Sequence, residues 1–208
     1  MNSRKDRLLL IFTRNPELGK CKTRLAAVTG DEAALEIYKF LLQHTVSVTR
    51  DLRLAKRVCY TEAIRQDDYW DPDIYQKALQ QGNDLGERML TAFEQGFAEG
   101  YNKIVIIGSD MYDLSQADLE EAFYRLENTG YVLGPAMDGG YYLLGMKAVE
   151  PRLFRGKNWG SATVLKDTLN DLEGKSLALL PVKNDIDVYE DIKDIPAFKP
   201  FIKHLKND

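Results

Sequence analysis

Three carboxylates stand in surroundings that suit a divalent cation or a proton transfer. Asp110 closes a Gly-Ser-Asp turn directly after the apolar run 104–107, and Asp138 precedes two adjacent glycines. Asp187 ends an Asp-Ile-Asp segment, 185–187, whose two carboxylates face the same side in extended backbone. Mg²⁺ often takes only one or two protein carboxylates and fills its shell with phosphate oxygens and water. Asp110 is therefore a candidate ligand for Mg²⁺ or Mn²⁺, and the carboxylates of 185–187, Asp187 among them, are candidates for a second ligand.

Two of these carboxylates are also the candidate catalytic residues. Asp110 would act through the metal, and Asp138 would orient an acceptor hydroxyl or take its proton as a general base. Each segment also has a purely structural interpretation. Asp110 could cap a turn through backbone N–H groups, 185–187 could be an acidic surface turn, and the Asp138 segment could be a hairpin turn.

Four cations lie within the eleven residues 14–24, which follow the first apolar run of the chain. They are Arg14, Lys20, Lys22 and Arg24. Arg binds a phosphate through two parallel hydrogen bonds, whereas Lys acts as a point charge. A solvated basic loop would have the same composition. The position of the 14–24 loop after a buried strand favours the binding of a diphosphate.

A second candidate for the nucleotide lies at the predicted start of a helix. Asp84, Leu85, Gly86 and Arg88 occupy this turn, where free N–H groups and the helix dipole favour an anionic or hydroxyl-rich ligand. An ordinary N-cap explains Asp84 equally well, but it does not explain Arg88.

Small and aromatic residues further along the chain are candidates for binding an acceptor. Gly139 and Gly140 admit a close approach of the backbone to a ligand. Trp159 precedes a Gly-Ser pair and can present its indole face to a sugar or a base. A single Trp is more often a core residue, so the packing interpretation stays open.

The hydrophobic pattern predicts the elements that position these residues. Apolar runs predict strands at 7–13, 57–61, 75–79, 104–107, 131–135, 141–146 and 176–180, the fifth and sixth forming an antiparallel or bent return. Helical spacing predicts helices at 32–49, from 85 to a stop at Gly100, at 115–128 and at 161–172. The predicted caps of the first, second and fourth helices are Asp31, Asp84 and Ser161. Strands that alternate with helices indicate an α/β fold, with three αβα layers around a mostly parallel, Rossmann-like sheet. No GxGxxG sequence follows the first strand.

Whole-chain properties narrow the class of partner. A length of 208 residues favours a single domain over 1–208. A net charge of −4 argues against a nucleic-acid partner and favours a small ligand. Two distant cysteines and two histidines give no redox or zinc spacing, which fits a reducing cytoplasm. No stretch approaches the ~20 apolar residues of a membrane span, and the basic start of the chain lacks a signal-peptide core.

Taken together, the segments resemble the DUF2064 family of glycosyltransferase-A-like proteins. The family is related to the nucleotidyltransferases that build molybdenum and deazaflavin cofactors. The segments that carry the resemblance span about residues 8 to 193, and they are 12–14, 22–26, 82–89, 107–110, 134–145, 159–161, 185–187 and the Glu190-Asp191 pair.

The resemblance implies a nucleotide-diphospho-sugar transferase fold of the glycosyltransferase-A type. Asp110 matches the metal position and Asp187 the later acidic position. The sequence departs from the family where Tyr112 replaces a common proline and where Val188-Tyr189 replaces a common Thr-Pro. Both departures are candidates for reshaping the donor pocket and so for changing its substrate.

We therefore expect a metal-dependent transferase that moves a sugar from a nucleotide sugar to a small-molecule acceptor. One alternative is a nucleotidyltransferase that releases pyrophosphate from a nucleoside triphosphate. Another is a nucleotide-binding protein without turnover.

Overall fold

The strands form where the sequence is most apolar, and they assemble into one sheet. The computed structural model describes residues 6–206. β1 (Arg7–Thr13) lies near the centre and pairs in parallel with β2 (Ala55–Tyr60) and β4 (Lys103–Gly108). Leu8 and Leu10 enter the core on one face of the sheet, while Leu9 and Ile11 enter the core on the other. Burial on both faces therefore explains the unbroken apolar run 8–12 within β1.

The seven strands follow the order β3-β2-β1-β4-β6-β5-β7. The remaining strands are β3 (Gln76–Leu79), β5 (Tyr131–Pro135), β6 (Tyr141–Met146) and β7 (Leu177–Leu179). β6 is antiparallel to both of its neighbours, and every other pair is parallel. The antiparallel return between β5 and β6 and the mostly parallel sheet are both confirmed.

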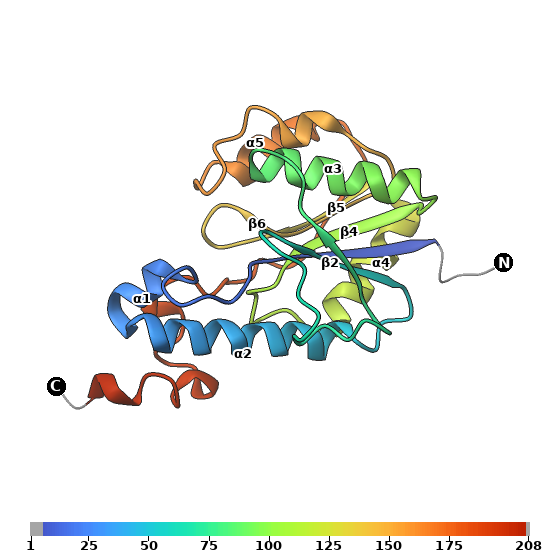
Figure 1. Cartoon of the computed structure of the whole chain (residues 1–208). Helices are drawn as coiled ribbons and strands as arrows, with labels where there is room; N and C mark the ends of the chain where they lie inside the picture. The colour runs from blue at the N-terminus through green and yellow to red at the C-terminus, as the bar shows by residue number, and fades with distance from the viewer. Residues whose placement is uncertain (1–5, 207–208) are drawn as a thin grey trace.

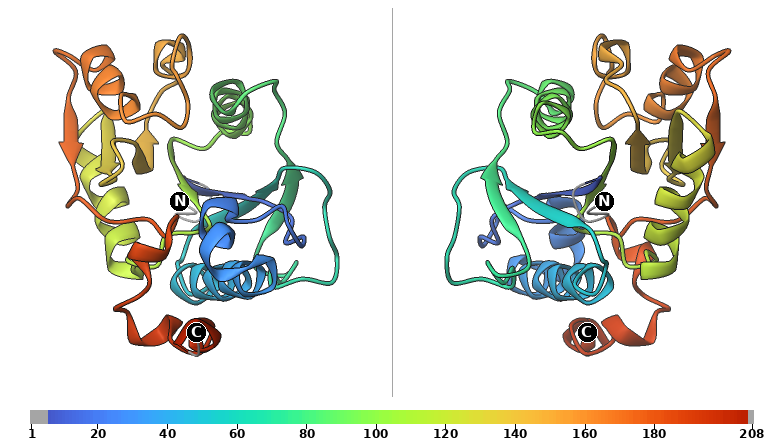
Figure 2. Two further views of the ribbon diagram at one scale, coloured as in Figure 1. Left: turned by 90° about the vertical axis from the view of Figure 1, so that its left-hand side faces the viewer. Right: turned by 90° about the vertical axis from the view of Figure 1, so that its right-hand side faces the viewer.

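Helices cover both faces of the sheet (Figure 1). α2 (Asp31–Thr49) and α4 (Gln116–Asn128) share one apolar core with the sheet, and α3 (Leu85–Ala98) and α5 (Val164–Asp171) share the other. Figure 2 shows these helix layers on opposite sides of the twisted strands. The three-layer αβα fold class is confirmed. Within residues 6–206, no helix has the length and apolar character to cross a membrane.

The C-terminal part of the chain packs outside these layers. It contains short 3-10 helices, η3 (Tyr189–Asp191), η4 (Pro196–Phe198) and η5 (Lys203–Lys206), and η2 (Pro151–Phe154) precedes α5. A third core joins this segment to α2 and to α1 (Thr23–Thr29), a short helix that the sequence pattern did not predict. Its buried members are Leu25, Ile37, Leu41, Ile186, Ile192, Phe198 and Ile202.

Of the three predicted helix caps, one is confirmed and two are wrong. Asp84 accepts a hydrogen bond from the Glu87 N–H at 2.8 Å. Ser115, predicted as the first residue of a helix, is instead the N-cap of α4 and forms a capping box with Asp118. Asp31 is instead the first helical residue of α2 and makes no cap hydrogen bond. Ser161 lies before α5 in a turn, where its hydroxyl contacts the hydroxyl of Thr163 at 3.0 Å. Both errors arise because a glycine or a turn, rather than the polar side chain, sets the helix start.

Candidate functional site

Three parallel strands end at the same edge of the sheet, and each is followed by a carboxylate. Asp110 follows β4, Asp138 follows β5 and Asp185 follows β7. β5 runs parallel to β4 because the antiparallel β6 lies between them, and β7 pairs in parallel with β5. The carboxyl edge of a parallel sheet is where ligands bind in this class of fold.

A buried hydroxyl network joins the ends of β1 and β4. The Ser109 hydroxyl lies 3.0 Å from the Thr13 hydroxyl and 3.3 Å from the Tyr38 hydroxyl. Tyr38 in turn accepts a hydrogen bond from the Arg14 backbone N–H at 2.9 Å. This network fixes the start of the 14–24 loop beside Asp110.

Lys22 is the residue of this loop that reaches Asp110. Its Nζ donates to Asp110 Oδ2 at 2.8 Å, and its side chain is only 7% exposed. Burial lowers the pKa of Lys22, but the charge of Asp110 outweighs this effect and raises it. Burial likewise raises the pKa of Asp110, while Lys22 brings it below its ordinary value. Both groups are therefore charged at neutral pH.

The backbone of Lys22 is unusual. With φ 49° and ψ 48°, it is the one residue other than glycine with positive φ within 6–206. A left-handed conformation costs an L-residue with a Cβ roughly 1–2 kcal/mol. Such strain is concentrated at functional sites, and here it turns the ammonium group of a loop residue inward to Asp110.

The acidic loop after β7 is held by Asp191. Asp191 Oδ2 accepts from the backbone N–H groups of Asp187 and Val188, at 2.9 and 2.8 Å, and Oδ1 accepts from the Asn184 amide at 2.9 Å. Asp187 then accepts from Arg24 at 2.8 Å. The Glu-Asp pair of the resemblance thus contributes a residue that positions the loop.

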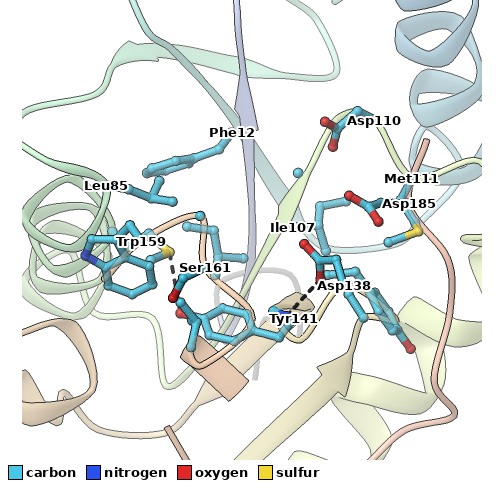
Figure 3. A pocket seen from close by; sticks show the side chains of 18 residues that line it. Phe12, Leu85, Ile107, Asp110, Met111, Asp138, Tyr141, Trp159, Ser161 and Asp185 are labelled. Atoms are coloured by element: carbon cyan, nitrogen blue, oxygen red, sulfur yellow. Dashed lines mark hydrogen bonds between the residues drawn. The ribbon is translucent and has the colours of Figure 1, made fainter. Parts of the chain in front are cut away.

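Asp185 is a site residue that the sequence prediction passed over in favour of Asp187. Burial raises its pKa to about 6, and the nearby carboxylates of Asp138 and Asp110 add to the effect. Figure 3 shows the three carboxyl groups along one side of a pocket, with Phe12, Leu85 and Trp159 on the other side. The i, i+2 spacing of the two aspartates in 185–187 indicated this segment, but it did not indicate which of the two lines the pocket.

Two cavities meet at these carboxylates. The larger, about 660 Å³, contains the basic loop and the start of α3, and we call it the donor cavity. The smaller, about 260 Å³, is mainly apolar, and we call it the acceptor cavity. The residues that line both are Phe12, Leu85, Gly108, Asp110, Asp138, Gly160 and Asp185.

Most of the predicted binding residues line these cavities. The donor cavity contains Arg14, Lys20, Lys22, Arg24, Asp84, Leu85, Arg88 and Asp187. Gly140 and Trp159 line the acceptor cavity.

Two predicted binding glycines are not among the lining residues of either cavity. A Cβ on Gly86 would lie 2.2 Å from the Phe154 carbonyl oxygen, and one on Gly139 would lie 2.4 Å from the Ala162 carbonyl oxygen. Both positions therefore require glycine for close packing of the chain.

The two departures from the family pattern also lie away from the cavities. Tyr112 packs edge-to-face on Phe198 of the C-terminal segment, with the two ring centroids 4.9 Å apart. Val188 and Tyr189 are likewise absent from the residues that line either cavity. Within residues 6–206, these three residues therefore do not line the donor cavity, and the prediction that they reshape it is not supported.

The donor set suits a hard divalent cation that also binds substrate oxygens. Within residues 6–206, no group of three or more His, Cys, Asp or Glu side chains is placed to hold a metal by itself. Asp110, Asp138 and Asp185 nevertheless face one space, and burial together with repulsion from the other two carboxylates raises the pKa of Asp185. Mg²⁺ and its substitutes require only one or two such carboxylates when phosphate and water complete the shell. The residues present fit that requirement.

Comparison with known proteins places this site in a known fold. A protein from Desulfovibrio desulfuricans, provisionally assigned as a nucleotide-diphospho-sugar transferase, is 29% identical, with a TM-score of 0.83 over 96% of this chain and 95% of that chain. Rv0371c of Mycobacterium tuberculosis, solved in complex with manganese, is 12% identical, with a TM-score of 0.54 over 95% and 98% of the two chains. A 4-diphosphocytidyl-2C-methyl-D-erythritol synthase from Anaerococcus prevotii is 7% identical, with a TM-score of 0.57 over 97% of each chain. No curated protein matches the sequence.

Residues 44–161, more than half of the chain, match the DUF2064 family, which is described as uncharacterized protein conserved in bacteria. The matched region includes β4, the Asp110 turn, the hairpin that carries Asp138, and Trp159. The chain therefore belongs to the DUF2064 family and has the nucleotide-diphospho-sugar transferase fold.

Proposed function

We propose that this chain is a metal-dependent glycosyltransferase that moves a sugar from a nucleoside-diphosphate donor to a small acceptor. The observation that carries the proposal is the junction of the two cavities at Asp110, Asp138 and Asp185. One cavity has the cations that a diphosphate needs, and the other has the apolar walls typical of a small-molecule pocket. A transferase requires such a junction, because two substrates must meet at one reacting centre.

The donor side follows from the charges in the basic loop. Lys22 and Arg24 are each paired with a carboxylate, Asp110 and Asp187 respectively. With Mg²⁺ or Mn²⁺ held by Asp110 and a neighbouring carboxylate, these cations can turn to the diphosphate while the local charge stays balanced. Such a metal ion supplies Lewis-acid stabilisation of the leaving diphosphate. The manganese found in the M. tuberculosis neighbour supports this choice.

The acceptor side assigns the proton transfer to Asp138. Its Oδ1 accepts a hydrogen bond from the Gly140 N–H at 2.8 Å, which orients the carboxylate and leaves Oδ2 for a substrate proton. The acceptor hydroxyl oxygen bonds to the anomeric carbon, and the bond from that carbon to the diphosphate oxygen breaks. The nucleoside diphosphate leaves with the bonding electrons, and the hydroxyl proton passes to Asp138.

A thermal-stability panel tests the donor. Nucleoside diphosphates, nucleoside triphosphates and nucleotide sugars are added with and without Mn²⁺ to the wild type and to Asp110→Asn. A ligand at ~100 times its Kd stabilises the native state by ~2.7 kcal/mol, and we expect this only with Mn²⁺ and only in the wild type. The matched control is Asp51→Asn, at a residue whose side chain is 77% exposed and forms only a 3.9 Å contact with Arg50.

Product analysis then separates the reaction types. Release of a nucleoside diphosphate with a glycosylated acceptor supports the proposal. Release of pyrophosphate would replace it by nucleotidyl transfer, and metal-aided binding without any product would indicate a non-catalytic nucleotide-binding protein. If no nucleotide stabilises the wild type, the donor assignment is wrong.

A further inference from the structure

The walls of the acceptor cavity are aromatic and aliphatic. Phe12, Leu85 and Trp159 form one side, and Tyr141 lies beneath them (Figure 3). The other aliphatic or aromatic residues that line it are Met89, Ile106, Ile107, Met111, Ala136, Tyr142 and Val164. A cavity of about 260 Å³ with such walls favours the body of an apolar molecule.

The charge of this cavity has one sign. Among the described residues that line it, the charged side chains are Asp110, Asp138 and Asp185, and none is Lys, Arg or His. The donor cavity, in contrast, is lined by five cations, Arg14, Lys20, Lys22, Arg24 and Arg88, as well as by five aspartates. Of the two cavities, only the donor cavity therefore has cationic side chains in its lining to bind a phosphate.

A phosphorylated acceptor would be poorly held in the smaller cavity. A phosphate monoester brings up to about two negative charges at neutral pH. It would meet Asp138 and Asp185, and the cation whose charge reaches Asp185, Lys22, is already paired with Asp110 at 2.8 Å. A divalent cation at Asp110 would already be engaged by the donor diphosphate. A neutral hydroxyl has no such penalty, and it can donate its proton to a carboxylate.

Glycines hold the aromatic walls in place. A Cβ on Gly134 would lie 2.4 Å from the Tyr142 ring, and one on Gly86 would lie 2.7 Å from the Trp159 indole nitrogen. Each ring is therefore packed directly on backbone. Walls that are fixed in this way discriminate between ligands by shape and charge, because they do not rearrange to accommodate a poor fit.

We infer that the acceptor cavity takes a molecule with an apolar body, a free hydroxyl group and no phosphate. The inference rests on the proposed function, for which it names the class of acceptor. It also separates glycosyl transfer from nucleotidyl transfer to a phosphorylated acceptor, because the latter requires cations on the acceptor side.

A matched pair of fluorescent probes tests the inference. 2-Naphthol and 2-naphthyl phosphate share one apolar body and differ only in the phosphate, and their fluorescence anisotropy reports binding to the full chain. We expect 2-naphthol to bind at least ten times more tightly. Trp159→Ala should weaken 2-naphthol binding at least fivefold, while a cooperative thermal unfolding transition shows that the variant is folded.

A double variant tests the electrostatic part of the argument. Asp138→Asn with Asp185→Asn removes the two negative charges that face the acceptor, so the preference for 2-naphthol should fall severalfold. Asp51→Asn, which is remote from the cavity lining, should keep the wild-type preference.

The outcomes distinguish the two proposals. Equal or tighter binding of 2-naphthyl phosphate overturns the acceptor class. Failure of 2-naphthol to bind, while a nucleotide sugar still stabilises the protein, also overturns it and leaves the donor proposal intact. Binding of 2-naphthol without any effect of nucleotides supports the acceptor class and refutes the donor assignment.

Discussion

Lys22→Met isolates the charge at the centre of the donor cavity. Methionine keeps most of the length of the buried stem and removes the ammonium group that lies 2.8 Å from Asp110. Two consequences follow from the geometry. A donor diphosphate loses a charge-assisted hydrogen bond, and Asp110 loses the cation that competes with a metal ion for its carboxylate.

The substitution should affect nucleotide binding more than the stability of the fold. A hydrogen bond to a charged group contributes ~1.5–3 kcal/mol, so the Kd for a nucleoside diphosphate with Mn²⁺ should rise by roughly 10- to 100-fold. The Asp110 side chain is 43% exposed, so water can solvate the carboxylate after the substitution. The loss of stability should therefore stay near the ~0–1 kcal/mol of an exposed pair, which is at most ~4 °C in Tm for a chain of this size.

The assay is calorimetric titration of the wild type and the variant with nucleotide and, separately, with Mn²⁺ alone. We expect weaker nucleotide binding together with tighter binding of Mn²⁺ to the free protein. The matched control is Lys39→Met, which removes a lysine from an exposed 2.7 Å pair with Glu36 on α2. An unchanged nucleotide Kd in Lys22→Met, or a change of equal size in the control, would refute the role of Lys22.

Three further predictions test packing, pH dependence and cysteine chemistry. Gly134→Ala places a Cβ 2.4 Å from the Tyr142 ring, so denaturant unfolding should show a loss of ~1–3 kcal/mol. Burial raises the pKa of Asp118, but hydrogen bonds from Ser115 outweigh burial and lower the pKa. Asp118→Asn should therefore lower the free energy of unfolding by ~1 kcal/mol near neutral pH. This difference between wild type and variant should vanish as pH falls through the native pKa of Asp118. Burial raises the pKa of the Cys59 thiol to about 12, so a thiol reagent at pH 8 should modify Cys59 only as fast as the protein unfolds.

The fold was predictable because its main signals are local. The apolar runs that became β1 and β4 are buried on both faces, and such runs do not depend on distant partners for their character. The helix α1 was missed because seven residues give too short a window for helical periodicity. Its stability comes from contacts of Leu25 with α2 and the C-terminal segment, which are visible only in three dimensions.

Residues of the site could be predicted from the sequence, but the ion pair between two of them could not. The basic loop and the Asp110 turn were both identified from residue type and position. The ion pair of Lys22 with Asp110 joins residues 88 positions apart, and it depends on a left-handed backbone at Lys22 that no residue-type preference indicates. The prediction assigned Lys22 to phosphate and Asp110 to metal, but it could not show that each group is the other's partner.

The antiparallel strand β6 explains why Asp138 belongs to this site. If β6 were parallel to β4, the hairpin between β5 and β6 would turn at the opposite edge of the sheet, away from Asp110. Because β6 returns directly, β5 ends at the same sheet edge as β4, and the hairpin brings Asp138 next to the other carboxylates. The same hairpin supplies Tyr141 and Tyr142 to the apolar wall. The antiparallel direction of β6 thus places Asp138, the proposed general base, and two aromatic residues of the acceptor cavity on one short segment. This segment lies opposite the cations of the 14–24 loop.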